Sequence, residues 1–243
     1  MENHSYGQII GNKAARYQNL LADSYALMTD SHAVSHPSLP NYLALFSGST
    51  QGMTSDACPV TFPSLSLADD LLDSGYGFRA YAQNLPFAGD TICRASAGLY
   101  TRNHVPSIMF SDISKMRTMP YTQMAVDLAN DRYPALAFIS PNLCDDMHNC
   151  PIGTADAWLA LNLAPIIRYD AANNGLLILT YDESLDSDPA NHIATILVGP
   201  MVKNVRSSQN INHYNVLRTI EQMAGVAYLG RSSQATAISG IWK

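Results

Sequence analysis

The stretch SHPSLPNYLALFSGST, residues 35–50, places a serine at a proline-stiffened corner directly before an apolar helical run. Pro40 follows Ser38 closely, and proline is tolerated in the first turn of a helix. Ser38 is therefore expected near a helix N-terminus, where unpaired N–H groups and the helix dipole favour an anion. Its hydroxyl could attack a phosphoryl group, provided that a base or a metal activates it. An equal alternative is that Ser38 only caps the helix.

Two adjacent carboxylates, Asp182 and Glu183, follow the apolar run at 175–181. Neighbouring side chains in an extended strand point to opposite faces, but the chain turns where a strand ends. Both carboxylates can therefore reach one metal ion. The alternative from the residues alone is a solvated acidic loop.

The segment PNLCDDMHNC, residues 141–150, gathers Asp145, Asp146 and His148 between two cysteines. Acidic and imidazole groups at this density suit a metal or phosphate site. The alternative is a turn rich in Asx residues that cap their own backbone. We favour the functional interpretation, because a simple turn rarely needs both a histidine and a disulfide.

Other histidines are weaker candidates. His192 opens the apolar run at 192–200, and His213 opens the last helical pattern. A histidine at either place could be structural, with its ring hydrogen-bonded to a carbonyl group. His104, within TRNHVP, and His36, just before the candidate serine, complete the set.

The elements that must position these residues follow an alternating pattern. Short apolar runs bounded by turn signals predict buried strands: 24–29, 77–83, 135–141, 175–183 and 192–200. Helical patterns separate them: the run after Pro40, then 64–75, 154–175 with a kink or break expected at Pro165, and 213–225. This alternation predicts one α/β domain over 1–243, with a mostly parallel central sheet and helices on both faces. Ligands of such sheets bind beyond the carboxyl ends of the strands.

Composition narrows the possible partners. The chain is 47% hydrophobic and 14% charged, which indicates a globular protein, and its net charge is −6. An acidic protein does not suit nucleic acid as its main partner, although a local metal can attract a small phosphorylated substrate. No segment approaches the roughly 18 apolar residues of a membrane span. The start, MENHSYGQII, lacks the basic and apolar regions of a signal peptide.

The four cysteines are compatible with two disulfides. Cys144 and Cys150 bracket one short loop and form the favoured local pair, which leaves Cys58 with Cys93. Such bonds favour an oxidising compartment. The alternative is four free, buried thiols.

Five stretches together resemble a known family: ENHSY at 2–6, SHPSLPNYLALFSGST at 35–50, PNLCDDMH at 141–148, ILTYDE at 178–183 and NHIATILVGP at 191–200. They occur in the order found in the phosphoesterase family of acid phosphatases and phospholipases C, which has the alkaline-phosphatase-like α/β fold. They are most similar to its secreted acid phosphatase branch, which includes phosphatidylinositol-3-phosphatase-like members. The resemblance therefore implies a secreted or periplasmic protein that acts on a small phosphomonoester, with phosphoinositides among the candidate substrates.

The resemblance implies a role for several of these residues. Ser38 would be the nucleophile, with Asn41 beside it, and a phosphoserine would form and then be hydrolysed by water. His148 would contact the phosphate or protonate the leaving group, and Asp146 would orient it. His192, His104 and His36 are weaker candidates for contacts to the substrate phosphate.

The resemblance also implies a divalent metal ion. Glu2 and Asn3 would hold it, and Asp182, Glu183 and the Ser38 oxygen would complete its shell. Oxygen ligands suit calcium, magnesium or manganese, while added histidines admit zinc or iron. In the family an apolar strand precedes the Glu-Asn pair, whereas here that pair follows Met1 directly, so we expect frayed ligands.

Two other functions compete with a metal-dependent phosphomonoesterase. One is a phosphodiesterase of the phospholipase C type. The other is a non-catalytic phosphate-binding protein, which a damaged N-terminal metal motif would produce.

Overall fold

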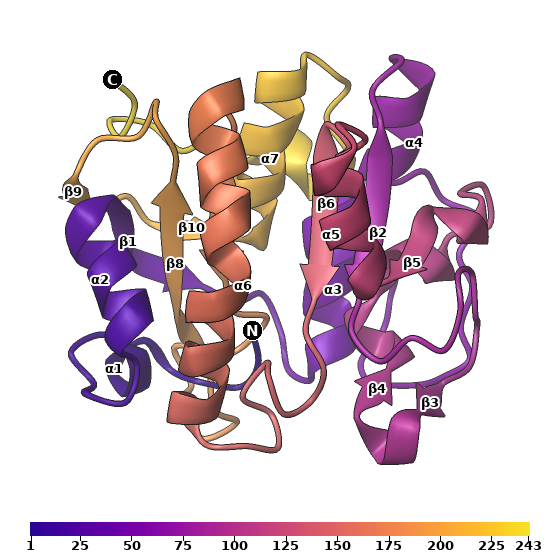
Figure 1. Cartoon of the computed structure of the whole chain (residues 1–243), viewed down its shortest axis with the longest axis horizontal. Helices are drawn as coiled ribbons and strands as arrows, with labels where there is room; N and C mark the ends of the chain where they lie inside the picture. Colours follow the sequence, from indigo (N-terminus) through magenta and orange to yellow (C-terminus); the bar gives the residue numbers. More distant parts are fainter. The chain divides into compact units, whose positions relative to one another are not determined.

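The computed structural model describes residues 1–243, and the chain divides into two compact units. Unit 1 comprises Met1–Ser35, Cys144–Asn212 and Ile238–Lys243, and unit 2 comprises His36–Leu143 and His213–Ala237. Figure 1 labels the elements of both units. The expectation of one domain stays a prediction.

Unit 1 holds a mixed sheet in the order β10 (Ile211–Asn212), β1 (Ala26–His32), β8 (His192–Val198) and β7 (Leu177–Thr180), with β9 (Val205–Ser207) also paired to β1. β1 is parallel to β9 and β10, but β8 is antiparallel to both β1 and β7. The expectation of a mostly parallel central sheet is therefore wrong for this unit. β8 runs antiparallel to β7 because the connection between them is too short for a parallel crossover and contains no helix.

The helices of unit 1 are α1 (Tyr6–Ile9), α2 (Arg16–Ser24) and α6 (Ile152–Asn173). Pro165 lies inside α6, which runs on as one helix, so the expected break does not occur. α2 follows Ala15, whose side chain cannot cap a helix, and the N–H groups of Tyr17 and Gln18 instead donate to the Asp156 carboxylate at 2.8 and 3.0 Å. The first turn of α2 therefore depends on a residue of α6.

Unit 2 contains a parallel sheet in the order β5 (Thr118–Pro120), β2 (Phe78–Ala82) and β6 (Leu136–Ser140), and a short hairpin of β3 (Arg94–Ala95) and β4 (Tyr100–Thr101). Its helices are α3 (Ser38–Ser47), α4 (Leu67–Asp73), α5 (Thr122–Ala129) and α7 (His213–Ala224). Single 3-10 turns occur at Ser96–Gly98, Arg102–His104, Pro106–Met109, Lys115–Arg117 and Gly230–Gln234. All pairs in this sheet are parallel, and α5 joins β5 to β6 as the prediction expects. The connection from β2 to β5 instead consists of the hairpin and 3-10 turns.

The core of unit 2 forms around α3. Nearly all residues of this helix are buried, which fits a helix that is apolar on most of its surface. The Phe46 ring packs against the rings of Phe78, Phe110 and Phe138 at centroid distances of 5.6, 5.7 and 5.8 Å. The helix that carries Ser38 is therefore held rigidly by aromatic packing.

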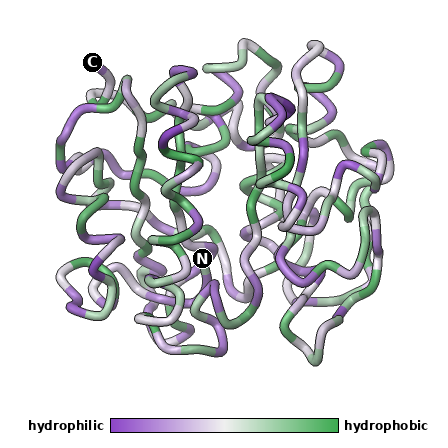
Figure 2. Tube along the Cα trace, viewed as in Figure 1, coloured by the Kyte–Doolittle hydropathy of each residue, from purple (hydrophilic) through white to green (hydrophobic).

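Apolar stretches are short along the whole trace, and polar residues interrupt them (Figure 2). None of the helices combines the length and the apolar character that a membrane span requires. Both predicted disulfides are present, Cys58–Cys93 in unit 2 and Cys144–Cys150 in unit 1, and their pairing is confirmed.

We expect Gly48→Ala to destabilise the protein more than Gly52→Ala. Both glycines have a positive φ, +69° and +72°, so either alanine would cost about 1–2 kcal/mol of backbone strain. A Cβ at Gly48 would also overlap the Leu229 carbonyl, whereas nothing lies within 4 Å of one at Gly52. Urea unfolding of both variants measures the difference, and equal losses would contradict the packing argument.

The stability of unit 1 should depend on the protonation of Asp170. Burial raises the pKa of this carboxyl from its usual 3.8 to about 6, so the folded state binds its proton more tightly than the unfolded state. This group therefore adds stability below pH 3.8 that is lost as the pH rises through 6. We expect Asp170→Asn to flatten this fall in the unfolding free energy, and the exposed control Asp112→Asn to leave it unchanged.

Candidate active site

Ser38 is the first residue of α3 and is 4% exposed. The predicted position at a helix N-terminus is therefore correct, and Pro40 lies in the first turn as expected. Asn41 is one turn further, on the same side of the helix, and its Nδ2 donates to the Pro37 carbonyl at 3.1 Å. This bond fixes the Asn41 side chain along the edge of α3 that carries the serine.

The N-terminus of α3 offers an anion fewer donors than the sequence suggests. Pro37 precedes the helix and Pro40 lies in its first turn, and neither has an N–H group. The Leu39 N–H donates to the Asp56 carboxylate at 2.8 Å. Sequence reasoning missed Asp56, although a proline at the cap position signals that the cap must come from elsewhere.

Two candidate histidines lie in unit 2. His104 ends a 3-10 turn, is 5% exposed and stacks on the Tyr42 ring at a centroid distance of 5.1 Å. Its carbonyl accepts the Ser140 hydroxyl at 2.6 Å, which ties this turn to the end of β6. His36 is partly buried and directly precedes Pro37.

Unit 1 gathers the acidic candidates. Asp182 and Glu183 follow β7 after Tyr181, at the strand exit that the sequence predicts, and both are buried. Glu2 and Asp146 are also buried, and a carboxylate oxygen of each lies within 4.8 Å of the other. Two like charges this close and withdrawn from water must be compensated by a cation, a proton or hydrogen-bond donors.

The first residues of the chain are tied to this cluster. The Met1 amino group donates to the Thr180 carbonyl at 3.1 Å, and the Asp182 N–H donates to the Met1 carbonyl at 3.0 Å. The Glu2 N–H donates to the Asp146 carbonyl at 2.9 Å, and the Asn3 N–H donates to the Asp182 carboxylate at 3.3 Å. The expectation of frayed ligands is wrong, because backbone bonds to two loops fix their position.

The remaining candidate histidines of unit 1 have different settings. The side chain of His148 is exposed, and its Nδ1 lies 2.7 Å from Asn149 Oδ1. The backbone N–H of His148 donates to the Asp146 carboxylate at 2.8 Å. His192 Nε2 lies 3.1 Å from the Thr29 carbonyl, and its ring stacks on Tyr6 at 4.5 Å. The contacts of His192 are those of a structural histidine.

The residues present in unit 1 fit a divalent cation. The Oδ1 atom of Asn3 is buried and accepts no hydrogen bond, so this oxygen is available as a metal ligand. It accompanies the buried carboxylates of Glu2, Asp146 and Asp182. Carboxylate and amide oxygens are the ligands that magnesium, calcium and manganese prefer. The membership of Ser38 and Glu183 in this shell stays a prediction.

The sequence matches that of the Phosphoesterase family over residues 8–227. It is 40% identical over 242 residues to a phosphatidylinositol-3-phosphatase from Mycobacterium tuberculosis, a match that covers 99% of this chain and 80% of that protein. It is 29% identical over 247 residues to an acid phosphatase from Aspergillus fumigatus, which covers 95% of this chain and 55% of that protein.

A solved structure of a protein in the alkaline phosphatase superfamily from Vibrio parahaemolyticus is also similar. The TM-score is 0.65 at 11% identity, over 98% of this chain and 69% of that chain. At this identity the likeness concerns the fold alone.

Divalent cations should stabilise the chelator-treated protein. Because the ion would bind the folded cluster only, the unfolding free energy should rise by about 2.7 kcal/mol at a hundredfold excess over Kd. Thermal unfolding with added magnesium, calcium, manganese or zinc measures this gain. Asp182→Asn should lose most of it, while Asp23→Asn, which alters an exposed carboxylate paired with Arg206, should keep it. An equal gain in both variants would contradict the site.

Proposed function

This chain belongs to the phosphoesterase family and hydrolyses phosphoester bonds, and we propose that it is a metal-dependent phosphomonoesterase that uses Ser38 as its nucleophile. The observation that carries the metal dependence is a set of buried oxygen side chains: carboxylate oxygens of Glu2 and Asp146 lie within 4.8 Å of each other, the Asn3 N–H donates to the Asp182 carboxylate at 3.3 Å, and Asn3 Oδ1 is buried. Four oxygen side chains withdrawn from water, one of them without a hydrogen-bond partner, are costly unless a cation completes them.

Each of these residues would serve a metal ion in a definable way. Glu2, Asn3 and Asp182 supply oxygen ligands, and the backbone bonds of Met1 and Glu2 hold the N-terminal pair in place. A divalent ion bound there would neutralise charge on phosphoryl oxygens and lower the pKa of a serine hydroxyl. The resemblance assigns Ser38 and Glu183 to the same shell.

The reaction we propose has two displacements. The Ser38 oxygen attacks phosphorus in line as its proton departs, the bond from phosphorus to the ester oxygen breaks, and the alcohol leaves with a proton from an imidazole such as His148. Water then attacks the phosphoserine, which releases inorganic phosphate and restores the serine hydroxyl. The exposed ring of His148 can exchange protons with solvent between these steps. Asn41, fixed on the same side of α3 as the serine, can donate to a phosphoryl oxygen.

The relatives support a proposal for the substrate class. The similarity to a phosphatidylinositol-3-phosphatase and to an acid phosphatase supports a phosphomonoester, with phosphoinositides among the candidates. Two disulfides support an oxidising compartment such as the periplasm or the outside of the cell.

The test is release of p-nitrophenol from p-nitrophenyl phosphate across about pH 4 to 9, with EDTA and with each metal added back. Ser38→Ala should lower kcat by at least about 10³-fold, because the nucleophile cannot be replaced. Ser47→Ala is the matched control, since it removes a serine of the same helix that is also 4% exposed.

The two residues also differ in what the mutation removes. Ser47 donates to the Leu43 carbonyl at 2.8 Å, so its loss should cost stability and leave kcat near that of the parent. Turnover that survives in Ser38→Ala, or that EDTA does not reduce, would contradict the proposal. Trapping of a phosphorylated serine at acid pH, followed by peptide mapping, tests the intermediate directly.

A further inference from the structure

We propose that Asp56 is a positioning residue for the nucleophile, and that the Cys58–Cys93 disulfide holds Asp56 in place. The inference deepens and rests on the proposed function, since it concerns the helix end that presents Ser38. It links an exposed carboxylate, which no motif of the sequence marks, to the geometry of the reacting oxygen.

The first step is the capping bond. Pro37 stands at the cap position of α3, and its side chain has no oxygen to accept an N–H group. The Asp56 carboxylate accepts the Leu39 N–H at 2.8 Å in its place. Leu39 is directly bonded to Ser38, so this bond fixes the peptide unit that follows the nucleophile.

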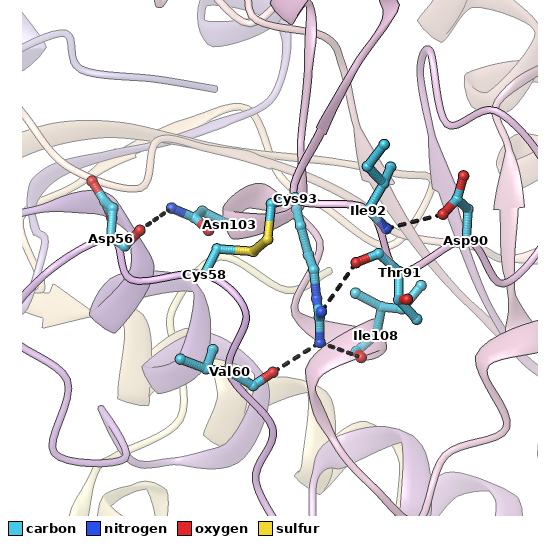
Figure 3. The surroundings of a disulfide bond; sticks show 10 residues. Asp56, Cys58, Val60, Asp90, Thr91, Ile92, Cys93, Asn103 and Ile108 are labelled. Atoms are coloured by element: carbon cyan, nitrogen blue, oxygen red, sulfur yellow. Dashed lines mark hydrogen bonds between the residues drawn. A yellow bond between two sulfur atoms is a disulfide. The ribbon is translucent and has the colours of Figure 1, made fainter.

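The second step is the anchoring of Asp56 itself. Its carbonyl accepts Nδ2 of Asn103 at 2.8 Å, and the Cys58–Cys93 bond lies two residues along the chain. Figure 3 shows these contacts together, with the disulfide between the Asp56 and Cys93 segments. The bond to the Asp56 carbonyl and the nearby disulfide therefore hold this exposed residue next to the first turn of α3.

The third step concerns Arg102, which links the two chain segments that the disulfide joins. The Arg102 side chain is 3% exposed and donates to the carbonyls of Thr91, Val60 and Ile108 at 3.1, 2.8 and 3.3 Å. Its partners are carbonyl groups on both sides of the disulfide, so it joins the segment of Val60 to that of Thr91. Burial lowers the pKa of this guanidinium, and the carbonyl contacts engage both of its terminal nitrogens.

Loss of the capping bond would affect catalysis by displacing the Ser38 oxygen. A first turn without its cap frays, and a misplacement of about 1 Å can cost on the order of 10²-fold in rate. An amide oxygen accepts an N–H as a carboxylate does, so Asp56→Asn should keep the position of the turn. Asp56→Ala removes the acceptor.

The experiment measures kcat and KM for p-nitrophenyl phosphate well below the unfolding temperature. Asp56→Ala should lower kcat about 10-fold with KM changed less than about 3-fold, and Asp56→Asn should stay within about 2-fold of the parent. Amide hydrogen exchange at Leu39 should speed up in Asp56→Ala and stay slow in Asp56→Asn. Asp90→Ala is the matched control, because Asp90 caps the Ile92 N–H beside the same disulfide at 2.9 Å.

A double-mutant cycle tests the role of the disulfide. Replacement of Cys58 and Cys93 by serine should lower kcat, and Asp56→Ala added to it should lower kcat little further, because the second change removes a carboxylate that the first has already released from its position.

The outcomes separate this inference from the proposed function. If Ser38→Ala abolishes turnover while Asp56→Ala leaves kcat and Leu39 exchange unchanged, the positioning role is wrong and the nucleophile stands. Equal losses in Asp56→Ala and Asp56→Asn would also overturn it, since the charge and not the acceptor would then matter. Turnover retained in Ser38→Ala would overturn the proposed function and, with it, the role of Asp56.

Discussion

Charge that is withdrawn from water must be compensated, and this constraint organises unit 1. Glu2, Asp146 and Asp182 are almost fully buried, and an ionised carboxylate in such a setting is stable only with a cation, a proton or several N–H donors. Two of the donors are backbone N–H groups: that of Asn3, which donates to the Asp182 carboxylate, and that of His148 in the loop after β6, which donates to the Asp146 carboxylate. The N-terminal segment that carries Glu2 and Asn3 is thereby held in place by backbone hydrogen bonds to the two loops that carry Asp146 and Asp182.

The pairing of the strands explains why the site residues come from strand exits. A strand delivers its last side chains to a fixed place because its backbone is paired along its length, and the loop that follows can turn freely. Asp182 follows β7, and Asp146 lies in the loop after β6, where its carboxylate accepts the backbone N–H of His148 at 2.8 Å. Rigid strands thus set the place of these groups, and the loops set their direction.

Sequence reasoning succeeded where one local signal decided the outcome. The apolar runs became β1, β2, β6, β7 and β8, and Ser38 stands at the start of α3, because periodicity and proline chemistry act over a few residues. It failed for β8, whose direction depends on how a connection without a helix returns to the sheet. Asp56 escaped notice for a similar reason, since its partner Leu39 is 17 residues away and only the folded loop unites them.

The remote capping of α2 has a consequence for the order in which the protein forms. Asp156 lies 139 residues after Tyr17, and at a synthesis rate of about 5–20 residues per second it emerges on the order of ten seconds later. A nine-residue helix is only marginal in water without tertiary contacts. During that interval the segment of α2 has been synthesised, but the carboxylate that caps its first turn has not. We therefore expect α2 to form stably only after synthesis has reached α6.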